Sequence, residues 1–347
     1  MTHAAANEMP SSEPDTTKPV SAAVRIWLLL LAVLVVTMVV VGGATRLTDS
    51  GLSITEWQLI TGTIPPLTGA AWQEAFAKYQ QIPEYSLINH GMSLDEFKFI
   101  YWWEWSHRFL GRFIGIVFII PCVLFWMSGQ IPRWLAPRLV IMLLLGGAQG
   151  ALGWYMVSSG LVDRVDVSQY RLAAHLGLAV AIFGFIWWTF LTVSRVRGSA
   201  PAQARGRRLA HILAALVFLQ VLLGGLVAGL DAGMGYATWP LMDGAIIPHG
   251  LLVMQPWYLN LFENALTVQF DHRLLAYVIW LLAGWHALRA TADRAGALLL
   301  FALVTLQAGL GIWTLLAGVP LSIALWHQLG AVVVFATALL HLARLTP

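Results

Sequence analysis

Four histidines hold matching positions in the two halves of this 347-residue chain. His107 and His175 lie in the first half, and His272 and His327 lie in the second. Each of the four lies near the beginning of its own long apolar segment, so we expect all of them at one depth in the membrane. Two imidazoles on facing helices can bind a flat iron macrocycle from both sides. The pattern therefore predicts two heme sites, one in each half.

Other metal centres fit these residues less well. A non-heme iron centre combines histidines with several carboxylates, but only Glu104 and Asp271 lie close to the four histidines, one to each site. Cys122 is the single cysteine, which excludes an internal disulfide and a thiolate cluster. The C-x-x-C-H attachment motif is absent, so a heme would be bound noncovalently.

The two predicted sites differ at one ionisable position. Glu104 precedes His107 by three residues, and Gln269 stands at the same distance before His272. If the helix that carries His107 begins early enough, Glu104 shares a face with it, one turn away. A carboxylate in one half and an amide in the other suggest that the first site performs chemistry and the second transfers electrons.

Several arginines lie near the same ends of the apolar segments. A guanidinium can bind a heme propionate through two hydrogen bonds, although interfacial arginines also extend toward the lipid headgroups for their own hydration. The candidate propionate contacts are Arg46, Arg108, Arg112, Arg171 and Arg273.

The composition indicates that membrane-spanning helices position these residues. Hydrophobic residues make up 59% of the chain and charged residues 11%, whereas soluble proteins carry about 25% charged residues. The apolar runs are continuous and near the ~20 residues that a bilayer requires, so helices rather than strands are expected. We predict an all-α integral membrane protein with eight spans, at 24–45, 107–128, 134–157, 172–194, 208–230, 270–290, 294–316 and 322–343.

The basic residues predict the orientation. Twelve of the 20 Lys and Arg residues fall on the side of the N-terminus, in the tail and the short loops. The positive-inside rule then places both termini in the cytoplasm. The long loops 46–106 and 231–269 lie outside, with the four histidines just beneath them. The net charge of +3 gives no reason to expect a nucleic-acid partner.

An internal repeat divides the chain. Eight residues of segment 42–66 recur without a gap in segment 224–248, 182 positions later. Gln149 and Gln307 begin a second matching motif. The repeat predicts two tandem pseudo-symmetric four-helix bundles with the same orientation. The predicted divisions are a disordered tail at 1–22, the first bundle at 23–197, a cytoplasmic linker at 198–207 and the second bundle at 208–347.

These motifs together resemble the heme A synthase family. The resemblance covers nearly the whole chain after the tail and rests on five segments. They are GGATRLTDSGLS (42–53), EWSHR (104–108), AAHLG (173–177), QFDHR (269–273) and WHQLG (326–330). Many members of the family have cysteine pairs that this chain lacks. It therefore looks like the cysteine-free branch found in proteobacteria and mitochondria, and thiol chemistry is not expected.

The resemblance implies an activity and a role for each site residue. Members oxidise the C8 methyl of heme O to a formyl group, through hydroxylated intermediates, to make heme A for cytochrome oxidase. By motif, His107 and His175 would hold the substrate heme O, and His272 and His327 would ligate a permanent heme b. Glu104 would be the catalytic carboxylate. Heme O synthase, cytochrome oxidase assembly and membrane lipid are the implied partners. We expect the protein in the bacterial inner membrane rather than in the mitochondrial inner membrane.

Two other functions and the oligomeric state stay open at this point. A diheme b-type electron carrier would use His286 and His341, which lie 14 residues after His272 and His327 and so near the same helix faces. The first half lacks this spacing, so we expect these two histidines to be structural. A transporter would explain the repeat, but not the matched histidines. A homo-oligomer is a further hypothesis that the sequence does not test.

Overall fold

The computed structural model describes residues 19–58, 61–161, 165–196 and 204–346, and this part of the chain is helical with one isolated β-bridge. Eight helices of 22 or more residues account for most of it. They are α1 (Ala22–Leu47), α4 (Leu94–Met127), α5 (Ala136–Val157), α6 (Gln169–Val193), α7 (Ala204–Gly229), α10 (Ala265–Arg289), α11 (Arg294–Leu316) and α12 (Leu321–Arg344).

The all-helical membrane fold is confirmed, and the number of spans needs one comment. Among the described residues, seven of the long helices are both long and apolar enough to cross a bilayer. The eighth, α10, has the necessary length but is less apolar, since it carries Asp271, His272 and Arg273 in its N-terminal part. Such a segment is stable in lipid when its polar side chains face other helices.

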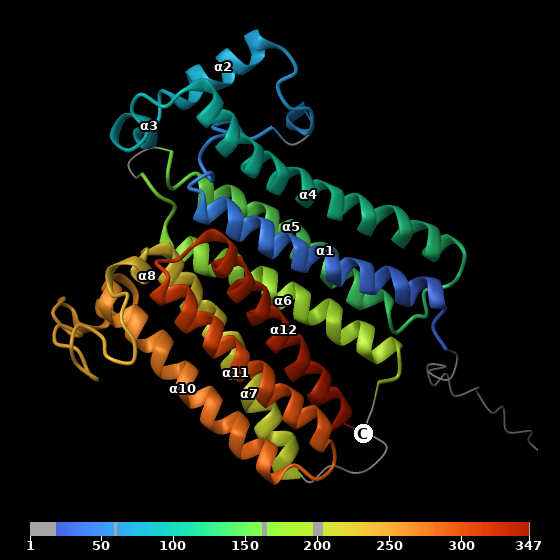
Figure 1. The fold of residues 1–347 in the computed structure, drawn as a ribbon. Coiled ribbons are helices and arrows are strands. Elements are labelled where there is room, and N and C mark those ends of the chain that lie inside the picture. Colours follow the sequence, from blue (N-terminus) through green and yellow to red (C-terminus); the bar gives the residue numbers. More distant parts are fainter. Residues whose placement is uncertain (1–18, 59–60, 162–164, 197–203, 347) are drawn as a thin grey trace, which may run out of the picture.

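The helices pack as neighbours in two similar sets (Figure 1). In the first set, α1 packs against α4 and α6, and α5 packs against α6. In the second, α7 packs against α10 and α12, with α11 between α10 and α12. Contacts among α1, α6, α7 and α12 join the sets, and one hydrophobic cluster runs through both, from Trp27 to Phe335.

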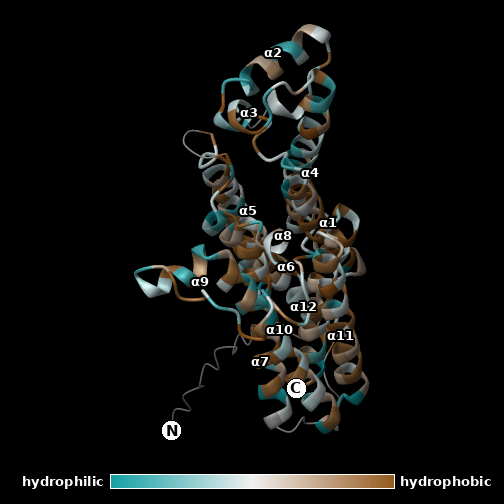
Figure 2. Cartoon of the chain, turned by 60° about the vertical axis from the view of Figure 1, so that its left-hand side comes forward, coloured by the Kyte–Doolittle hydropathy of each residue, from teal (hydrophilic) through white to brown (hydrophobic). Residues whose placement is uncertain are grey.

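The two sets differ in how closely their outer helices pack. The helices α10 and α11 pack along each other, whereas α4 and α5 touch over a short stretch only. Figure 2 shows α4 and α5 on opposite sides of the α6 helix. Beyond Glu104, no residue of α4 is buried. The first bundle is therefore open along one side.

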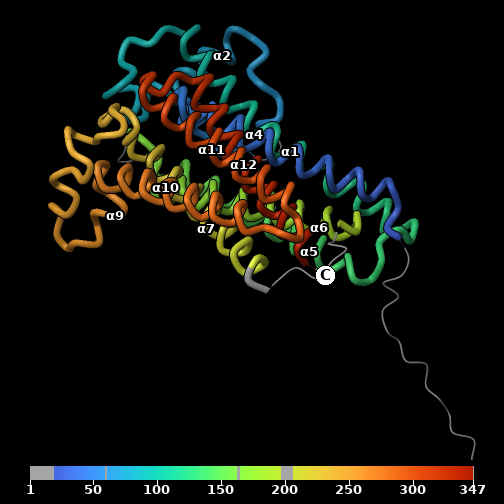
Figure 3. The backbone as a smooth tube through the Cα atoms, turned by 60° about the horizontal axis from the view of Figure 1, so that its bottom comes forward, coloured from blue at the N-terminus to red at the C-terminus, as the bar shows by residue number. Residues whose placement is uncertain are grey.

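Short helices lie at one end of the bundle. The α2 (Gly69–Tyr79) and α3 (Pro83–Leu87) helices follow α1, and α8 (Ala232–Gly235) and α9 (Asn260–Glu263) follow α7. Figure 3 shows α2 and α9 at the end of the long helices away from the C-terminal end of α12. Phe76, Tyr79 and Phe97 form a small hydrophobic core that fixes α2 against the start of α4.

Three predicted boundaries need correction. The second span was expected over 107–128, but α4 begins at Leu94, where Ser93 and Glu96 form a capping box. The fifth span was expected from residue 208, yet α7 begins at Ala204, inside the predicted linker 198–207, because arginine is a good helix former in water. The tail was expected to extend to residue 22, but Ser21 already caps α1. The other residues of the tail and linker, 1–18 and 198–203, lie outside the described part.

Candidate heme-binding site

The first histidine pair lies between α4 and α6. The ring centroids of His107 and His175 are 6.5 Å apart, with the ring planes at 61° to each other. The Nδ1 atom of His107 is buried and has no hydrogen-bond partner among the described residues. The structure thus brings the two predicted ligands of the first half together across the bundle.

The second pair lies at the corresponding place between α10 and α12. His272 lies on α10 and His327 on α12, and both of these helices pack against α7 and α11. His175, His272 and His327 lie six or seven residues after the start of their helices, whereas His107 lies thirteen residues after the early start of α4. The arrangement gives two donor pairs at related positions, as the repeat predicts.

A glycine on a neighbouring helix packs against each of the four rings. A Cβ atom at these glycines would lie about 3 Å from the Cε1 atom of the imidazole, which is closer than side chains normally pack. The distances are 2.8 Å for Gly42 and His107, 2.9 Å for Gly153 and His175, 3.3 Å for Gly224 and His272, and 2.8 Å for Gly311 and His327. A Cβ at Gly42, Gly153 or Gly311 would force the ring to shift, whereas at Gly224 the ring would have to give by a few tenths of an ångström.

Glutamines contact three of the four histidines. The amide Nε2 donates to the histidine's own carbonyl oxygen at 2.7–3.0 Å and lies 3.0–3.2 Å from its Nδ1. In each, the amide Oε1 is buried and accepts no hydrogen bond within the described chain. The pairs are Gln149 with His175, Gln220 with His272 and Gln307 with His327.

Glu104 lies on α4, one turn before His107, and is 3% exposed. Its Oε2 accepts hydrogen bonds from the Ser53 hydroxyl at 2.8 Å and from the Ile54 backbone N–H at 2.7 Å. The guanidinium of Arg108 donates to the other oxygen. The early start of α4 therefore places the carboxylate beside the first histidine pair and fixes both of its oxygens.

Gln269 occupies the same place in the second half. Its Oε1 accepts from Arg273 at 3.0 Å, and its Nε2 donates to the Ala232 carbonyl at 2.9 Å. Arg108 and Arg273 also correspond, because each donates to two carbonyl oxygens of the segment that follows α1 or α7. The two halves share the arginine contacts but differ in the acid and in its other partners, since Glu104 accepts from Ser53 and Ile54 whereas Gln269 donates to Ala232.

The other candidate arginines have partners in the protein. Arg46 forms ion pairs with Asp49 at 2.8 Å and Asp231 at 2.7 Å, which connects the ends of the two halves. Arg112 donates to the Gln58 carbonyl at 2.7 Å. Arg171 donates to the Tyr155 carbonyl at 2.6 Å and lies over the tyrosine ring.

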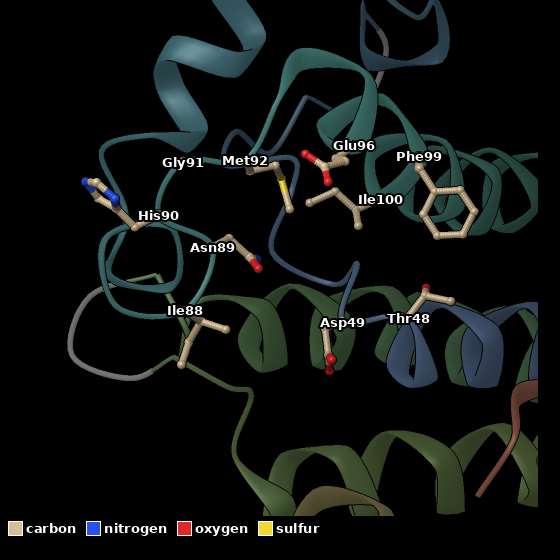
Figure 4. Close-up of a pocket in the computed structure, with 10 residues that line it drawn as sticks. All are labelled: Thr48, Asp49, Ile88, Asn89, His90, Gly91, Met92, Glu96, Phe99 and Ile100. Carbon is tan, nitrogen blue, oxygen red and sulfur yellow. The ribbon is translucent and has the colours of Figure 1, made fainter.

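Two pockets open at the end of the first half that carries α2 and α3. One, of about 570 Å³, lies between the end of α1, the segment after α3 and the start of α4 (Figure 4). None of the predicted site residues lines it. The other, of about 410 Å³, is lined by Arg108 and Arg112 together with Ser53 and Ile54, which hold Glu104.

His286 and His341 do not form a third heme site. Their Nε2 atoms are 2.8 Å apart, and His341 Nδ1 lies 2.9 Å from the carboxylate of Asp293. Two nitrogens on opposite sides of a metal would stand roughly 4 Å apart, given metal–nitrogen bonds of ~2 Å. The buried pair leaves no space for a macrocycle, which argues against the diheme electron carrier and agrees with a structural role.

Comparison with known proteins gives the family. The model of the cytochrome oxidase assembly protein family COX15-CtaA matches residues 25–339. The chain belongs to this family. It is 54% identical to the heme A synthase of Chelativorans sp. (strain BNC1), over 97% of this chain and 95% of that protein. It is 54% identical to the heme A synthase of Parvibaculum lavamentivorans, over 93% and 94%, and 53% identical to that of Bradyrhizobium diazoefficiens, over 93% and 91%.

For this family member, the sequence alone missed part of the polar framework. The Ser53 and Ile54 contacts to Glu104 come from an irregular segment, whose path cannot be derived from periodicity. The three glutamines could have been found, since each stands four residues before the glycine that contacts the ring. One helical turn separates these positions, so both face the same histidine.

Proposed function

We propose that the protein is a heme A synthase that oxidises the C8 methyl of heme O to a formyl group and thereby supplies heme A to cytochrome oxidase. The observation that carries the proposal is a buried carboxylate, Glu104, fixed one turn from a facing histidine pair. The names and high identity of the relatives support the same reaction.

In this proposal His107 and His175 hold the substrate heme O, and His272 and His327 hold a permanent heme b. The residues present fit such groups. The donors are imidazoles without competing thiolates, glycines clear the space beside each ring, and three buried amide oxygens lack partners within the described residues. A heme b bound in the second half would supply one-electron transfer.

Glu104 is the residue that we assign to catalysis. Its carboxylate can take a proton from, or stabilise positive charge on, the carbon being oxidised. Ser53, Ile54 and Arg108 hold both oxygens in place, so little reorganisation is needed during the reaction. Gln269 has the same scaffold but cannot exchange a proton, which suits a site that only transfers electrons.

The arginines near the outer surface are proposed to bind the propionates. Arg108 and Arg112 line the 410 Å³ pocket beside Glu104, where two guanidiniums could receive carboxylates. Arg273 corresponds to Arg108 in the second half. Arg46 and Arg171 do not line this pocket, so we assign them a weaker contribution.

The proposed setting is the bacterial inner membrane, with both termini in the cytoplasm and both histidine pairs near the outer face. Heme O synthase would supply the substrate and cytochrome oxidase assembly would receive the product. The test is to purify the protein from cells that make heme O and to identify the extracted porphyrins by mass. Heme A together with heme b supports the proposal; protein without heme, or with heme b alone, contradicts it.

A further inference from the structure

One of the four histidines lacks the glutamine contact that the other three share. In three helices a glutamine stands four residues before the ring-packing glycine. The position four residues before Gly42 is Met38. Its methyl group lies against α4, where a Cβ at Gly111 would be 3.3 Å away. A thioether is at best a weak hydrogen-bond acceptor, so the buried Nδ1 of His107 is left without a partner among the described residues.

The missing contact matters for metal binding. An imidazole that binds iron through Nε2 carries a hydrogen on Nδ1, and an acceptor for that hydrogen fixes the ring and strengthens the bond. Rotation of the amide of Gln149, Gln220 or Gln307 would present its partnerless Oε1 to this N–H. Met38 offers no such oxygen to His107.

The helix that carries His107 is also the more loosely packed one. Trp280, eight residues after His272, packs on Phe301 at 5.6 Å and donates to Thr305 at 3.0 Å, which closes α10 onto α11. Gly115 and Gly147 stand at the places in the first half that correspond to Trp280 and Thr305. A Cβ added to either glycine would have no neighbouring atom within 4 Å. Little side-chain packing therefore opposes a movement of α4 relative to α5.

From these two observations we propose that Met38 makes His107 the exchangeable heme ligand of the protein, while Gln149, Gln220 and Gln307 act as positioning residues that retain the other three. The inference rests on the proposed function, in which the first site must take up a heme and release it, and the second must keep one. Release of a bound heme would then begin with movement of α4, which carries His107, relative to α5.

The test measures heme loss in the full-length protein loaded with hemin, with apomyoglobin as the acceptor of released heme. Wild type is expected to lose heme in a fast and a slow phase, and His107→Ala identifies the fast phase by altering it alone. Met38→Gln is expected to slow the fast phase about 10-fold, the lower end of the effect of such outer contacts. Met38→Leu is the matched control and should leave this phase unchanged.

The reverse exchange tests the positioning residues. Gln220→Met and Gln307→Met should accelerate the slow phase by a similar factor, with the fast phase unaffected. An equal rate of the fast phase in Met38→Gln and Met38→Leu would overturn the proposal. An unchanged slow phase in both Gln220→Met and Gln307→Met would also overturn it. These two variants provide the test if Met38→Gln does not fold. A wild-type protein that takes up fewer than two hemin molecules would instead contradict the proposed two-site function.

Discussion

Glu104 and Gln269 occupy equivalent positions in the two halves, and each accepts a hydrogen bond from the arginine four residues later. The segment that follows the first helix of each half contacts both side chains, but Ile54 donates its N–H to Glu104, whereas the Ala232 carbonyl accepts from Gln269. The protein thus contains a natural comparison of acid and amide in one framework, and this comparison suggests the first experiment.

Glu104→Gln should preserve the fold and heme binding and abolish heme A formation. The amide oxygen can accept from Arg108, as that of Gln269 does from Arg273, but the amide cannot exchange a proton. We expect the rate to fall on the order of 100-fold or more, measured by chromatography of extracted hemes. Gln269→Glu is the matched control and should retain activity; heme A at the wild-type rate in Glu104→Gln would remove the carboxylate from the mechanism.

The assignment of heme b to the second half predicts which histidines retain it. His272→Ala and His327→Ala should each remove the low-spin heme b spectrum, because one axial ligand is lost. His286→Ala should leave that spectrum in place, since this side chain bonds to His341. Retention of heme b in His272→Ala together with its loss in His286→Ala would contradict the assignment.

The glycines beside the imidazoles predict a graded series. An alanine at Gly311 or Gly153 would place its Cβ 2.8–2.9 Å from a histidine carbon, whereas at Gly224 the distance is 3.3 Å. Overpacking of this kind costs about 1–3 kcal/mol and turns the ring away from its partner. Gly311→Ala should therefore lower heme content more than Gly224→Ala does.

Gly309→Ala serves as the control for this series, because no atom lies within 4 Å of its added Cβ. Heme content is measured per protein after purification. Equal heme content in Gly311→Ala and Gly309→Ala would show that the close approach has no consequence for binding.

A buried carboxyl in the outer segment predicts a pH dependence of stability. Glu84 is 4% exposed, and burial, followed by repulsion from Glu104, raises its pKa from 4.5 to about 8. The folded protein then holds this proton more tightly than the unfolded chain does, so its contribution is present below pH 4.5 and is lost as the pH rises to about 8. Glu84→Gln should raise the unfolding midpoint at pH 8.5 and change it little at pH 5.

Glu74→Gln, an exposed change on the neighbouring α2, is the control. It should shift the midpoint by a similar small amount at both pH values. If the difference between Glu84→Gln and wild type is the same at pH 5 and pH 8.5, the carboxyl does not hold its proton in the folded state.

Arg46 is expected to couple the two halves. Arg46→Ala and Asp231→Ala should each lower the unfolding midpoint, and the double variant should lower it by less than the sum, because both remove one ion pair. The pair is partly exposed, so the coupling should be about 0.2–1 kcal/mol and weaken with salt. Strict additivity in a double-mutant cycle would show that the contact is without energetic effect.

Much of the helical frame could be predicted from the sequence, because a span of ~20 apolar residues has few alternatives in lipid. The pairing of His107 with His175 also follows, since the repeat places them on corresponding helices. The looseness of α4 could not be predicted, because Gly115 and Ile116 fit a lipid-facing helix as well as a packed one. The contact of His286 with His341 could not be predicted either. Each lies 14 residues after a histidine of the second pair, and this spacing is also compatible with two ligands of a further heme.

The ion pairs of Arg46 make the junction between the two halves asymmetric. The position 182 residues later is Ala228, so the second half has no counterpart of this guanidinium, although Asp49 and Asp231 both remain and share a left-handed backbone. One cation therefore lies between two carboxylates that the repeat relates. A protein assembled from two copies of the second half would lose this link, because two carboxylates and no guanidinium would meet at the junction.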